Sequence, residues 1–385
     1  MVWPTQGDEK GILGTAAGFS NSILVVLSDT VAVLEVGEQN AASQGNGSVK
    51  VTGAGGNGFT VRCSVWHLKA TLHFTNLSSL TNVVWVGNKL IAACLSTSHI
   101  VVLEEKDGTL HEVEKLQCNA TIWLLAPTEN GAVVQLEGGT LLLLDLQKDP
   151  VSLVPMSESF PCSCDPMFVA GNQNVLGLSG RHRLMLGSKE LASNVTSVVL
   201  HSHFLLATTM EHRLLTRPLA SLESGTWESA GSRRVERGSR LVVAVPSHSR
   251  TVLQMPRGNL EVVQPRALAI LMLADLLDQA KYADAFLLAR RQRMNLNLLI
   301  DHDIQAFTNN LSIFVEQMLN KPDQLNLLVA ELVEEDVTKS MYAAHYPDKI
   351  HFAKEGKVSI VCKQVVLKVG TIKITIMYKL LYCVT

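Results

Sequence analysis

Residues Ala132–Leu146 read AVVQLEGGTLLLLDL, and this stretch indicates the fold of most of the chain. Two apolar runs flank Glu137-Gly138-Gly139, and the paired glycines supply the positive φ angles that a tight hairpin turn needs. Short apolar runs separated by tight turns recur from residue 12 to residue 263. The sequence therefore predicts a domain made almost entirely of antiparallel β hairpins.

The spacing of these hairpins favours one β architecture. The predicted hairpins and the final group of strands begin at residues 23, 90, 132, 175, 204 and 241. Two of the intervals match the ~40–45-residue repeat of a propeller blade, and the last interval is close to it. The longest interval holds a glycine-rich segment, Gly37–Gly58, which we interpret as an insertion. We predict a β-propeller of degenerate WD-type blades over residues 12–263; no Trp-Asp dipeptide is present, and a β-sandwich is the alternative.

The pattern changes after Pro265. Ala267–Ala280 has an apolar stripe at helical spacing, and Lys281–Arg293 follows with small residues that would let two helices lie close together. Ile304–Leu319 and Gln324–Leu332 are further helical stretches. Paired antiparallel helices are typical of an α-solenoid, so residues 266–342 are predicted to be the start of one.

The sequence pattern changes a second time near Ala343. Lys357–Thr385 contains no acidic residue and has β-branched runs such as Thr371–Ile376, which cannot extend a helical stack. We expect residues 343–385 to form a divergent, disordered or loosely strand-like tail.

Composition excludes several classes of protein. The 385 residues are 47% hydrophobic with a formal net charge of −2, which suits a globular protein without a global field for nucleic acid. Seven scattered cysteines suit a reducing compartment. We expect neither a secretory signal nor a membrane span, because the N-terminal region is interrupted by charges and no run of about 18 apolar residues occurs.

Three motifs invite a chemical interpretation. Gly53-x-Gly55-x-x-Gly58 matches a dinucleotide fingerprint, but a strand pattern follows it where a helix is required, which favours a flexible loop. Cys162-x-Cys164 lacks a second ligand pair for zinc, and His201-x-His203 is best explained by edge or loop histidines. Because no convergent acid–base set is found, we predict a protein that is not an enzyme and has no cofactor and no metal site.

Two arginine clusters are the remaining candidates for a binding site. One contains Arg233, Arg234, Arg237 and Arg240, and the other contains Arg290, Arg291 and Arg293. Guanidinium groups bind phosphate bidentately, so we name Arg290, Arg291 and Arg293 as candidate contacts to phosphate or to an acidic partner. A solvated helix face, or pairing with the acidic run Glu331–Asp336, is the alternative interpretation.

Longer motifs carry a family resemblance. LQMPRGNLEVV (Leu253–Val263), NLNLLIDHD (Asn295–Asp303) and EEDVTKSMY (Glu334–Tyr342) resemble the propeller-to-solenoid junction of the Elongator complex subunit 1 family. VERGSRLVVAVP (Val235–Pro246), ELASNVTS (Glu190–Ser197) and GAGGNGF (Gly53–Phe59) are similar to the second propeller of that family. The resemblance covers residues 12–342, so we expect a fragment or short isoform with a non-family C-terminal tail.

The resemblance implies a role. Members are the non-catalytic scaffold of the complex that modifies wobble uridines of tRNA, and the acetyl-transfer chemistry belongs to a separate radical-SAM subunit. The implied partners are the other Elongator subunits, including that catalytic one, with tRNA contacted only indirectly or weakly. The implied location is the cytoplasm, with the nucleus as an additional compartment. A free-standing propeller adaptor for protein–protein interaction is the alternative function.

Overall fold

The structure of the chain is a computed structural model. The structure describes residues 14–17, 22–26, 30–36, 48–52, 58–62, 66–73, 80–94, 98–106, 109–171, 174–222, 231–245, 248–318 and 321–346. The chain forms two compact units, Met1–Val195 and Thr196–Thr385, which are described separately. The predicted tail, apart from residues 343–346, lies outside the described residues.

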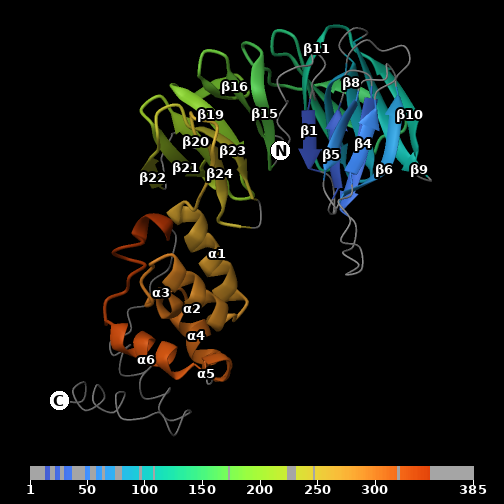
Figure 1. The fold of residues 1–385 in the computed structure, drawn as a ribbon. Coiled ribbons are helices and arrows are strands. Elements are labelled where there is room, and N and C mark those ends of the chain that lie inside the picture. Colours follow the sequence, from blue (N-terminus) through green and yellow to red (C-terminus); the bar gives the residue numbers. More distant parts are fainter. Residues whose placement is uncertain are drawn as a thin grey trace, which may run out of the picture. The chain divides into compact units, whose positions relative to one another are not determined.

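The first unit begins with an eight-stranded sheet of order β1-β2-β3-β6-β10-β9-β8-β7 (Figure 1). Its strands are β1 (Gly14–Ala17), β2 (Ser22–Val26), β3 (Thr30–Val36), β6 (Trp66–His73), β7 (Leu80–Val86), β8 (Lys89–Cys94), β9 (His99–Lys106) and β10 (Thr109–Gln117). The sheet is two antiparallel meanders of four strands each, joined by a parallel pairing of β10 with β6 at Thr109 and Thr71. Each meander has the form of one propeller blade.

The predicted insertion lies between two strands of the first blade. It contains β4 (Ser48–Thr52) and ends at the first residue of β5 (Gly58–Arg62), and these two strands form a separate antiparallel sheet between β3 and β6 in the sequence. Gly58 is the first residue of β5, while Gly53 and Gly55 lie outside the described residues, so the segment after the motif is a strand and not a helix. A dinucleotide fingerprint needs a helix after its glycines, so this motif has the wrong structural context for that function.

Two further four-stranded antiparallel sheets complete the first unit's described part. One consists of β11 (Ile122–Pro127), β12 (Gly131–Leu136), β13 (Leu141–Asp145) and β14 (Ser152–Pro155). The other consists of β15 (Cys164–Ala170), β16 (Asn174–Ser179), β17 (Leu184–Leu186) and β18 (Lys189–Ala192). The first strands of successive sheets lie against one another, β1 against β7, β7 against β11 and β11 against β15, which is the radial arrangement of a propeller.

The β12–β13 hairpin follows the sequence prediction closely. Gly138 and Gly139 have φ angles of 89° and 99°, so the paired glycines do supply the left-handed turn. Every residue of β12 is buried, and Gln135 in this strand makes two hydrogen bonds to the next sheet. Its Nε2 donates to the Cys164 carbonyl at 2.8 Å, and its Oε1 accepts from the Cys164 amide at 2.7 Å. A single buried amide thus joins neighbouring blades.

The second unit holds the remaining strands and the helices. Its sheets are β19 (Val195–Leu200), β20 (Phe204–Thr209), β21 (Arg213–Pro218) and β22 (Gly231–Arg234), followed by β23 (Arg240–Ala244), β24 (Thr251–Gln254) and β25 (Leu260–Val263). A short 3-10 helix, η1 (Leu219–Ser221), follows β21. One apolar core contains Leu253 and Val263 of the last sheet together with Ala267 and Leu268 of the first helix. The propeller and the helical segment therefore share a core at their junction.

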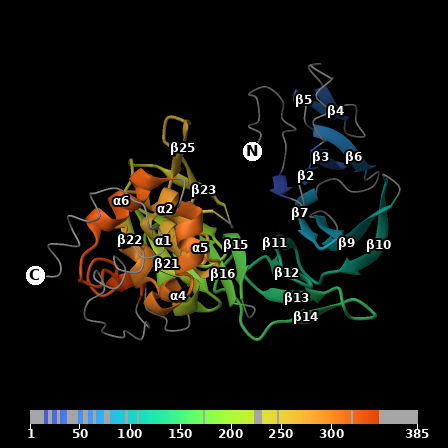
Figure 2. The ribbon, with the colours of Figure 1, turned by 90° about the horizontal axis from the view of Figure 1, so that it is seen from below.

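The helices begin within a few residues of Pro265, as predicted. They are α1 (Arg266–Asp278), α2 (Tyr282–Arg291), α3 (Leu298–Asp301), α4 (Ile304–Asn309), α5 (Leu311–Met318) and α6 (Pro322–Glu331), followed by the 3-10 turn η2 (Ala343–His345). Helix α2 packs against both α1 and α5 (Figure 2). Ala285 and Ala289 are fully buried on α2, which confirms that small residues permit the close approach.

The helical prediction was wrong in two details. Ile304–Leu319 is not one helix, because the chain breaks at Asn310 between α4 and α5. Thr308, Asn309 and Asn310 have low helix propensity and the Thr308 hydroxyl bonds the Ile304 carbonyl at 2.6 Å, so a break there costs little. The single turn α3 was not predicted, since four residues give no measurable period. In the described part of the chain, no helix has the length and apolarity needed to cross a membrane.

Candidate anion-binding site at the propeller–solenoid junction

Two of the long sequence motifs form a latch beside the junction. The Asn297 side chain is buried and donates from Nδ2 to the Glu331 carbonyl at 2.8 Å, while its Oδ1 accepts from the Val333 amide at 3.0 Å. Oδ2 of Asp301 accepts from the Val337 amide at 3.0 Å. The Asn295 amide donates to the Tyr342 hydroxyl at 2.9 Å. The Asn295–Asp303 segment thus holds the chain that follows α6.

The predicted arginines lie at the end of α2, before the segment that forms this latch. Arg290 and Arg291 occupy the last turn of α2, where their charge is favourable next to the negative end of the helix dipole. Arg293 lies beyond the helix with a φ angle of 51°. All three side chains are exposed.

The structure separates the three arginines. Nη1 of Arg290 lies 3.9 Å from the Glu331 carboxylate, which is the pairing with the acidic run that sequence analysis left open. Both groups are about half exposed, so this ion pair contributes at most about 1 kcal/mol. Arg293 instead borders a pocket with Arg266, Tyr342 and His345, of about 610 Å³. Arg291 borders a different pocket.

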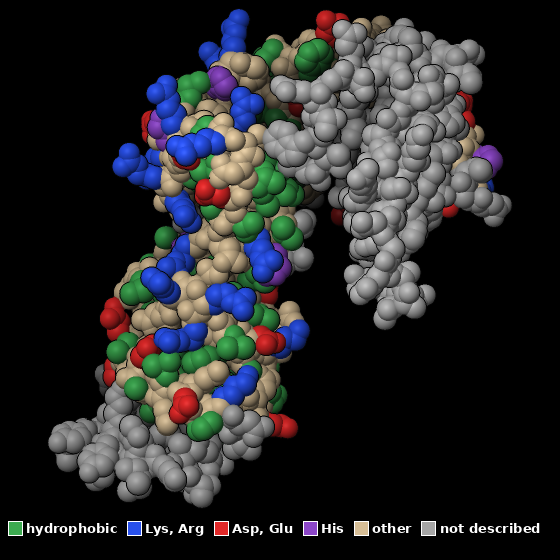
Figure 3. All heavy atoms as spheres, viewed as in Figure 1, with side chains coloured by type: hydrophobic (Ala, Val, Ile, Leu, Met, Phe, Trp, Pro, Cys, Tyr) green, Lys and Arg blue, Asp and Glu red, His purple; other side chains and the backbone are tan. Residues whose placement is uncertain are grey.

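Arg291 lines a groove of about 410 Å³ between the last strands and α2. Arg233 of β22 and Arg250, which precedes β24, line the same groove, together with Val262, Val263, Gln264 and Gln292. Lys and Arg side chains are prominent over this part of the second unit (Figure 3). The groove therefore unites one arginine from each predicted cluster with a third, Arg250, that sequence reasoning missed. Arg250 stands alone in the sequence, and no spacing signal could have found it.

A hydrogen-bond chain fixes the floor of this groove. Nε2 of Gln292 donates to Oε1 of Gln264, and Nε2 of Gln264 donates to the Ser249 hydroxyl at 3.3 Å. Nη1 of Arg266 donates to the Gln292 carbonyl at 2.9 Å. The end of α2 is thereby connected to the segment after β25 and to the turn that carries Arg250. The arrangement can hold a small anion, since guanidinium groups are permanently charged donors.

The cysteine and histidine motifs do not form comparable sites. Burial raises the pKa of the Cys164 thiol to about 12, so this residue is a poor metal ligand and nucleophile. His201 is buried and His203 is exposed, with ring centroids 6.4 Å apart. Burial lowers the pKa of His201. Within the residues that the structure describes, no group of three or more His, Cys, Asp or Glu side chains could hold a metal ion.

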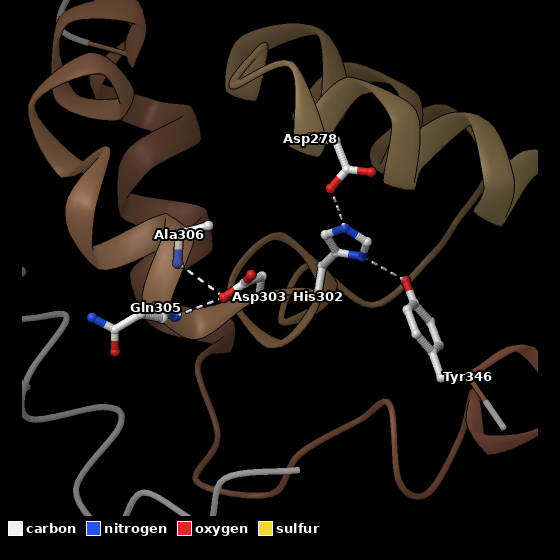
Figure 4. A network of polar contacts seen from close by, with 6 residues as sticks. All are labelled: Asp278, His302, Asp303, Gln305, Ala306 and Tyr346. Carbon is white, nitrogen blue, oxygen red and sulfur yellow. Dashed lines mark hydrogen bonds and ion pairs between the residues drawn. The ribbon is translucent and has the colours of Figure 1, made fainter. Parts of the chain in front are cut away.

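One polar network resembles a catalytic triad in composition. His302 lies between Asp278 and Tyr346, with 2.9 Å from Nε2 to the Asp278 carboxylate and 3.2 Å from Nδ1 to the Tyr346 hydroxyl (Figure 4). Burial raises the pKa of Tyr346, which keeps its hydroxyl protonated and opposes a nucleophilic role. The network joins the end of α1 to the segment after η2. We interpret it as a structural clamp, and next to it Asp303 caps α4 by accepting from the Gln305 and Ala306 amides.

Comparison with known proteins identifies the family. Residues 9–242 match the family model "ELP1 N-terminal second beta-propeller", and residues 266–381 match "ELP1 alpha-solenoid". The second match passes the boundary at residue 342, where sequence analysis expected the resemblance to end. It covers most of the segment that was expected to be divergent.

Full-length relatives agree with the family models. The chain is 30% identical to putative elongator complex protein 1 of Xenopus laevis, over 90% of this chain and 33% of that protein. It is 33% identical to elongator complex protein 1 of Mus musculus, over 85% of this chain and 28% of that protein, and 30% identical to that of Saccharomyces cerevisiae, over 70% and 22%. The chain thus spans about a third or less of the length of these relatives. It belongs to the Elongator complex protein 1 family, of which it carries the second β-propeller followed by the α-solenoid region.

Proposed function

We propose that this chain is a non-catalytic scaffold part of the Elongator complex, the assembly that modifies wobble uridines of tRNA. The observation that carries the proposal is the match of both domains, in order, to one family of Elongator subunits. The fold supports the scaffold role, since propellers and solenoids present extended surfaces to other proteins. Its partners would be the other Elongator subunits, including the radical-SAM acetyltransferase subunit, and it would act in the cytoplasm and also in the nucleus.

The proposal is tested by affinity purification of the tagged full chain from cells that express the other subunits. Co-purification of those subunits is expected, and it should resist a salt wash that removes purely electrostatic contacts. The matched control is the same chain with Phe286 changed to Asp. This places an unpaired charge in the helical core and should abolish recovery if a folded solenoid start is needed. A folded wild-type chain that recovers none of the subunits would contradict the proposal, and recovery of a different complex would favour a free-standing adaptor.

Contact with tRNA is proposed to be weak. Residues 232–300 carry eleven Lys and Arg against five Asp and Glu, which attracts phosphates over a long range. In the described part of this segment, however, the basic groove has no aromatic lining for bases to stack on. We expect tRNA affinity weaker than about 1 μM at physiological salt, falling steeply as salt rises. Fluorescence anisotropy with labelled tRNA over a salt series measures this, and tight binding insensitive to salt would contradict it.

A further inference from the structure

The basic groove at the junction has a charge arrangement that needs explanation. Arg233, Arg250 and Arg291 line it and no carboxylate does. Among the described residues, none of these three guanidinium groups takes part in an ion pair, whereas Arg290, next to Arg291, pairs with Glu331. Three like charges around one concavity repel one another, and the C-terminal end of the α2 dipole offsets this repulsion only at Arg291. Such an arrangement is typical of a site that an anion completes.

The groove is also held in place before any ligand arrives. Arg233 sits on β22, whose backbone pairs with β21 opposite Leu214. The Arg250 carbonyl accepts from the Val245 amide at 3.0 Å, which fixes the turn between β23 and β24. Gln264 and Gln292, which both line the groove, are hydrogen-bonded to each other, and this bond connects the end of α2 to the segment after β25. Anchored backbones under flexible arginines reduce the entropy lost on binding.

Size and charge select the class of anion. A concavity of about 410 Å³ accommodates one phosphorylated side chain, but it is small for a run of nucleotides. Its lining contains valines, glutamines and arginines without an aromatic ring, so it offers nothing on which bases could stack. A phosphomonoester carries about −1.5 to −2 charges at pH 7 on three acceptor oxygens, whereas each RNA phosphodiester carries one charge. Three arginines in one concavity match the monoester better.

We propose that this groove binds the phosphate of a phosphorylated serine or threonine on a partner protein. The site would make one docking contact of the scaffold dependent on phosphorylation of that partner. It involves Arg291 of the originally expected cluster, but neither Arg290 nor Arg293. The proposal is independent of which complex the chain joins, because the groove lies within the second unit alone.

The test uses the full purified chain and a fluorescein-labelled peptide, Gly-Gly-phosphoserine-Gly-Gly, in phosphate-free buffer. The groove variant is Arg233→Gln/Arg250→Gln/Arg291→Gln. Its matched control is Arg234→Gln/Arg257→Gln/Arg290→Gln, which removes the same charge from a strand, a loop and α2 without touching the groove lining. Circular dichroism and melting curves establish that both variants fold like the wild type; if the groove triple does not, the three single variants replace it.

We expect saturable binding by the wild type, weakened at least about tenfold by the groove variant and less than about twofold by its control. Inorganic phosphate should compete, and the glutamate peptide Gly-Gly-Glu-Gly-Gly should bind more weakly. Affinity should fall as pH drops from 7.5 to 5, because the phosphate loses its second charge near pH 6 and the groove lining contains neither a histidine nor a carboxylate.

Three results would overturn the proposal. The first is no saturable binding of the phosphopeptide up to about 10 mM. The second is an equal loss of affinity in the groove and control variants, which would mean a general electrostatic effect. The third is binding of a uridine oligonucleotide that is lost in the groove variant while the phosphopeptide does not bind, which would assign the groove to RNA. An RNA contact would also be insensitive to pH in this range, since phosphodiesters do not titrate.

Discussion

At the scale of single residues, two buried amide side chains connect elements that are separate in the sequence. Asn297 links α3 to the chain beyond α6, and Gln135 links two blades. Each is almost fully buried and satisfies backbone groups that would otherwise be left without partners. The cost of removing such a side chain is therefore set by the groups left behind rather than by the bond itself.

The change Asn297→Ala tests this directly. It leaves the Glu331 carbonyl and the Val333 amide without the side chain that binds them. We expect the free energy of unfolding of the second unit to fall by about 1–3 kcal/mol per unsatisfied group. Urea unfolding followed by far-UV circular dichroism measures it. Asn309→Ala, at an exposed position on α4, is the control and should be near neutral; equal effects would refute the latch.

His201 predicts a pH dependence of stability. Burial lowers its pKa below the usual 6.5, so the unfolded chain binds more protons than the folded one once the pH falls below about 6.5. Stability contributed by neutral His201 is present above that pH and is lost as the pH falls through it. The melting temperature should drop less between pH 7.5 and 5.5 in His201→Gln than in the wild type. His203→Gln, two residues away and exposed, should keep the wild-type dependence; if it behaves like His201→Gln, burial is not the cause.

At the scale of elements, the sequence predicted those parts whose signal is local. The β12–β13 hairpin could be located because two glycines interrupt two apolar runs, and α1 because its helix-forming residues follow Pro265 directly. Strands β14 and β22 were missed because they are mostly half-buried or exposed and show no alternation. Only pairing with a neighbouring strand defines such elements. The break at Asn310 was missed because the apolar period continues across it.

A matched pair of glycines tests the hairpin. Both Gly138 and Gly139 have positive φ, so alanine costs about 1–2 kcal/mol at either position through backbone strain. At Gly139 a Cβ would also lie 2.5 Å from the Phe160 carbonyl oxygen and 2.8 Å from that of Cys162, whereas at Gly138 it meets nothing. We expect Gly139→Ala to lower the free energy of unfolding of the first unit by at least about 2 kcal/mol more than Gly138→Ala. Equal losses in urea titrations would show that the backbone at Phe160 and Cys162 moves away from the new Cβ at little cost in free energy.

At the scale of the whole molecule, the sequence predicted the fold but not the basic groove, because the three arginines of the groove come together only in the tertiary structure. Arg291 was a candidate from sequence alone, but its companions Arg233 and Arg250 lie about sixty and forty residues earlier in the chain. Arg290 and Arg293 are its neighbours in sequence, yet one pairs with Glu331 and the other borders a different pocket. Successive helical residues point about 100° apart. A cluster in sequence is therefore a poor guide to a cluster in space.

The contacts of Tyr342 and Tyr346 indicate where the folded helical part of the chain ends. The sequence expectation was a disordered or loosely strand-like tail over residues 343–385, and residues 347–385 of it lie outside the described part of the chain. The described chain supplies a sharper boundary: Tyr342 is buried in the helical core and bonded to the Asn295 amide, and Tyr346 contacts His302. A chain ending at Tyr346 keeps all these contacts, while one ending at Met341 loses both tyrosines.

We therefore expect the chain ending at Tyr346 to melt within about 2 °C of the full chain, and the chain ending at Met341 to melt roughly 5–10 °C lower. The second value is the low end of the range of about 6–20 °C that follows from the 3–5 kcal/mol typically lost with a buried aromatic side chain and from a shift of 2–4 °C per kcal/mol for a domain of this size. Differential scanning calorimetry of the three chains decides between the boundaries. If the chain ending at Tyr346 also melts several degrees lower than the full chain, residues 347–385 stabilise the helical part. That outcome would agree with the solenoid family match, which extends to residue 381.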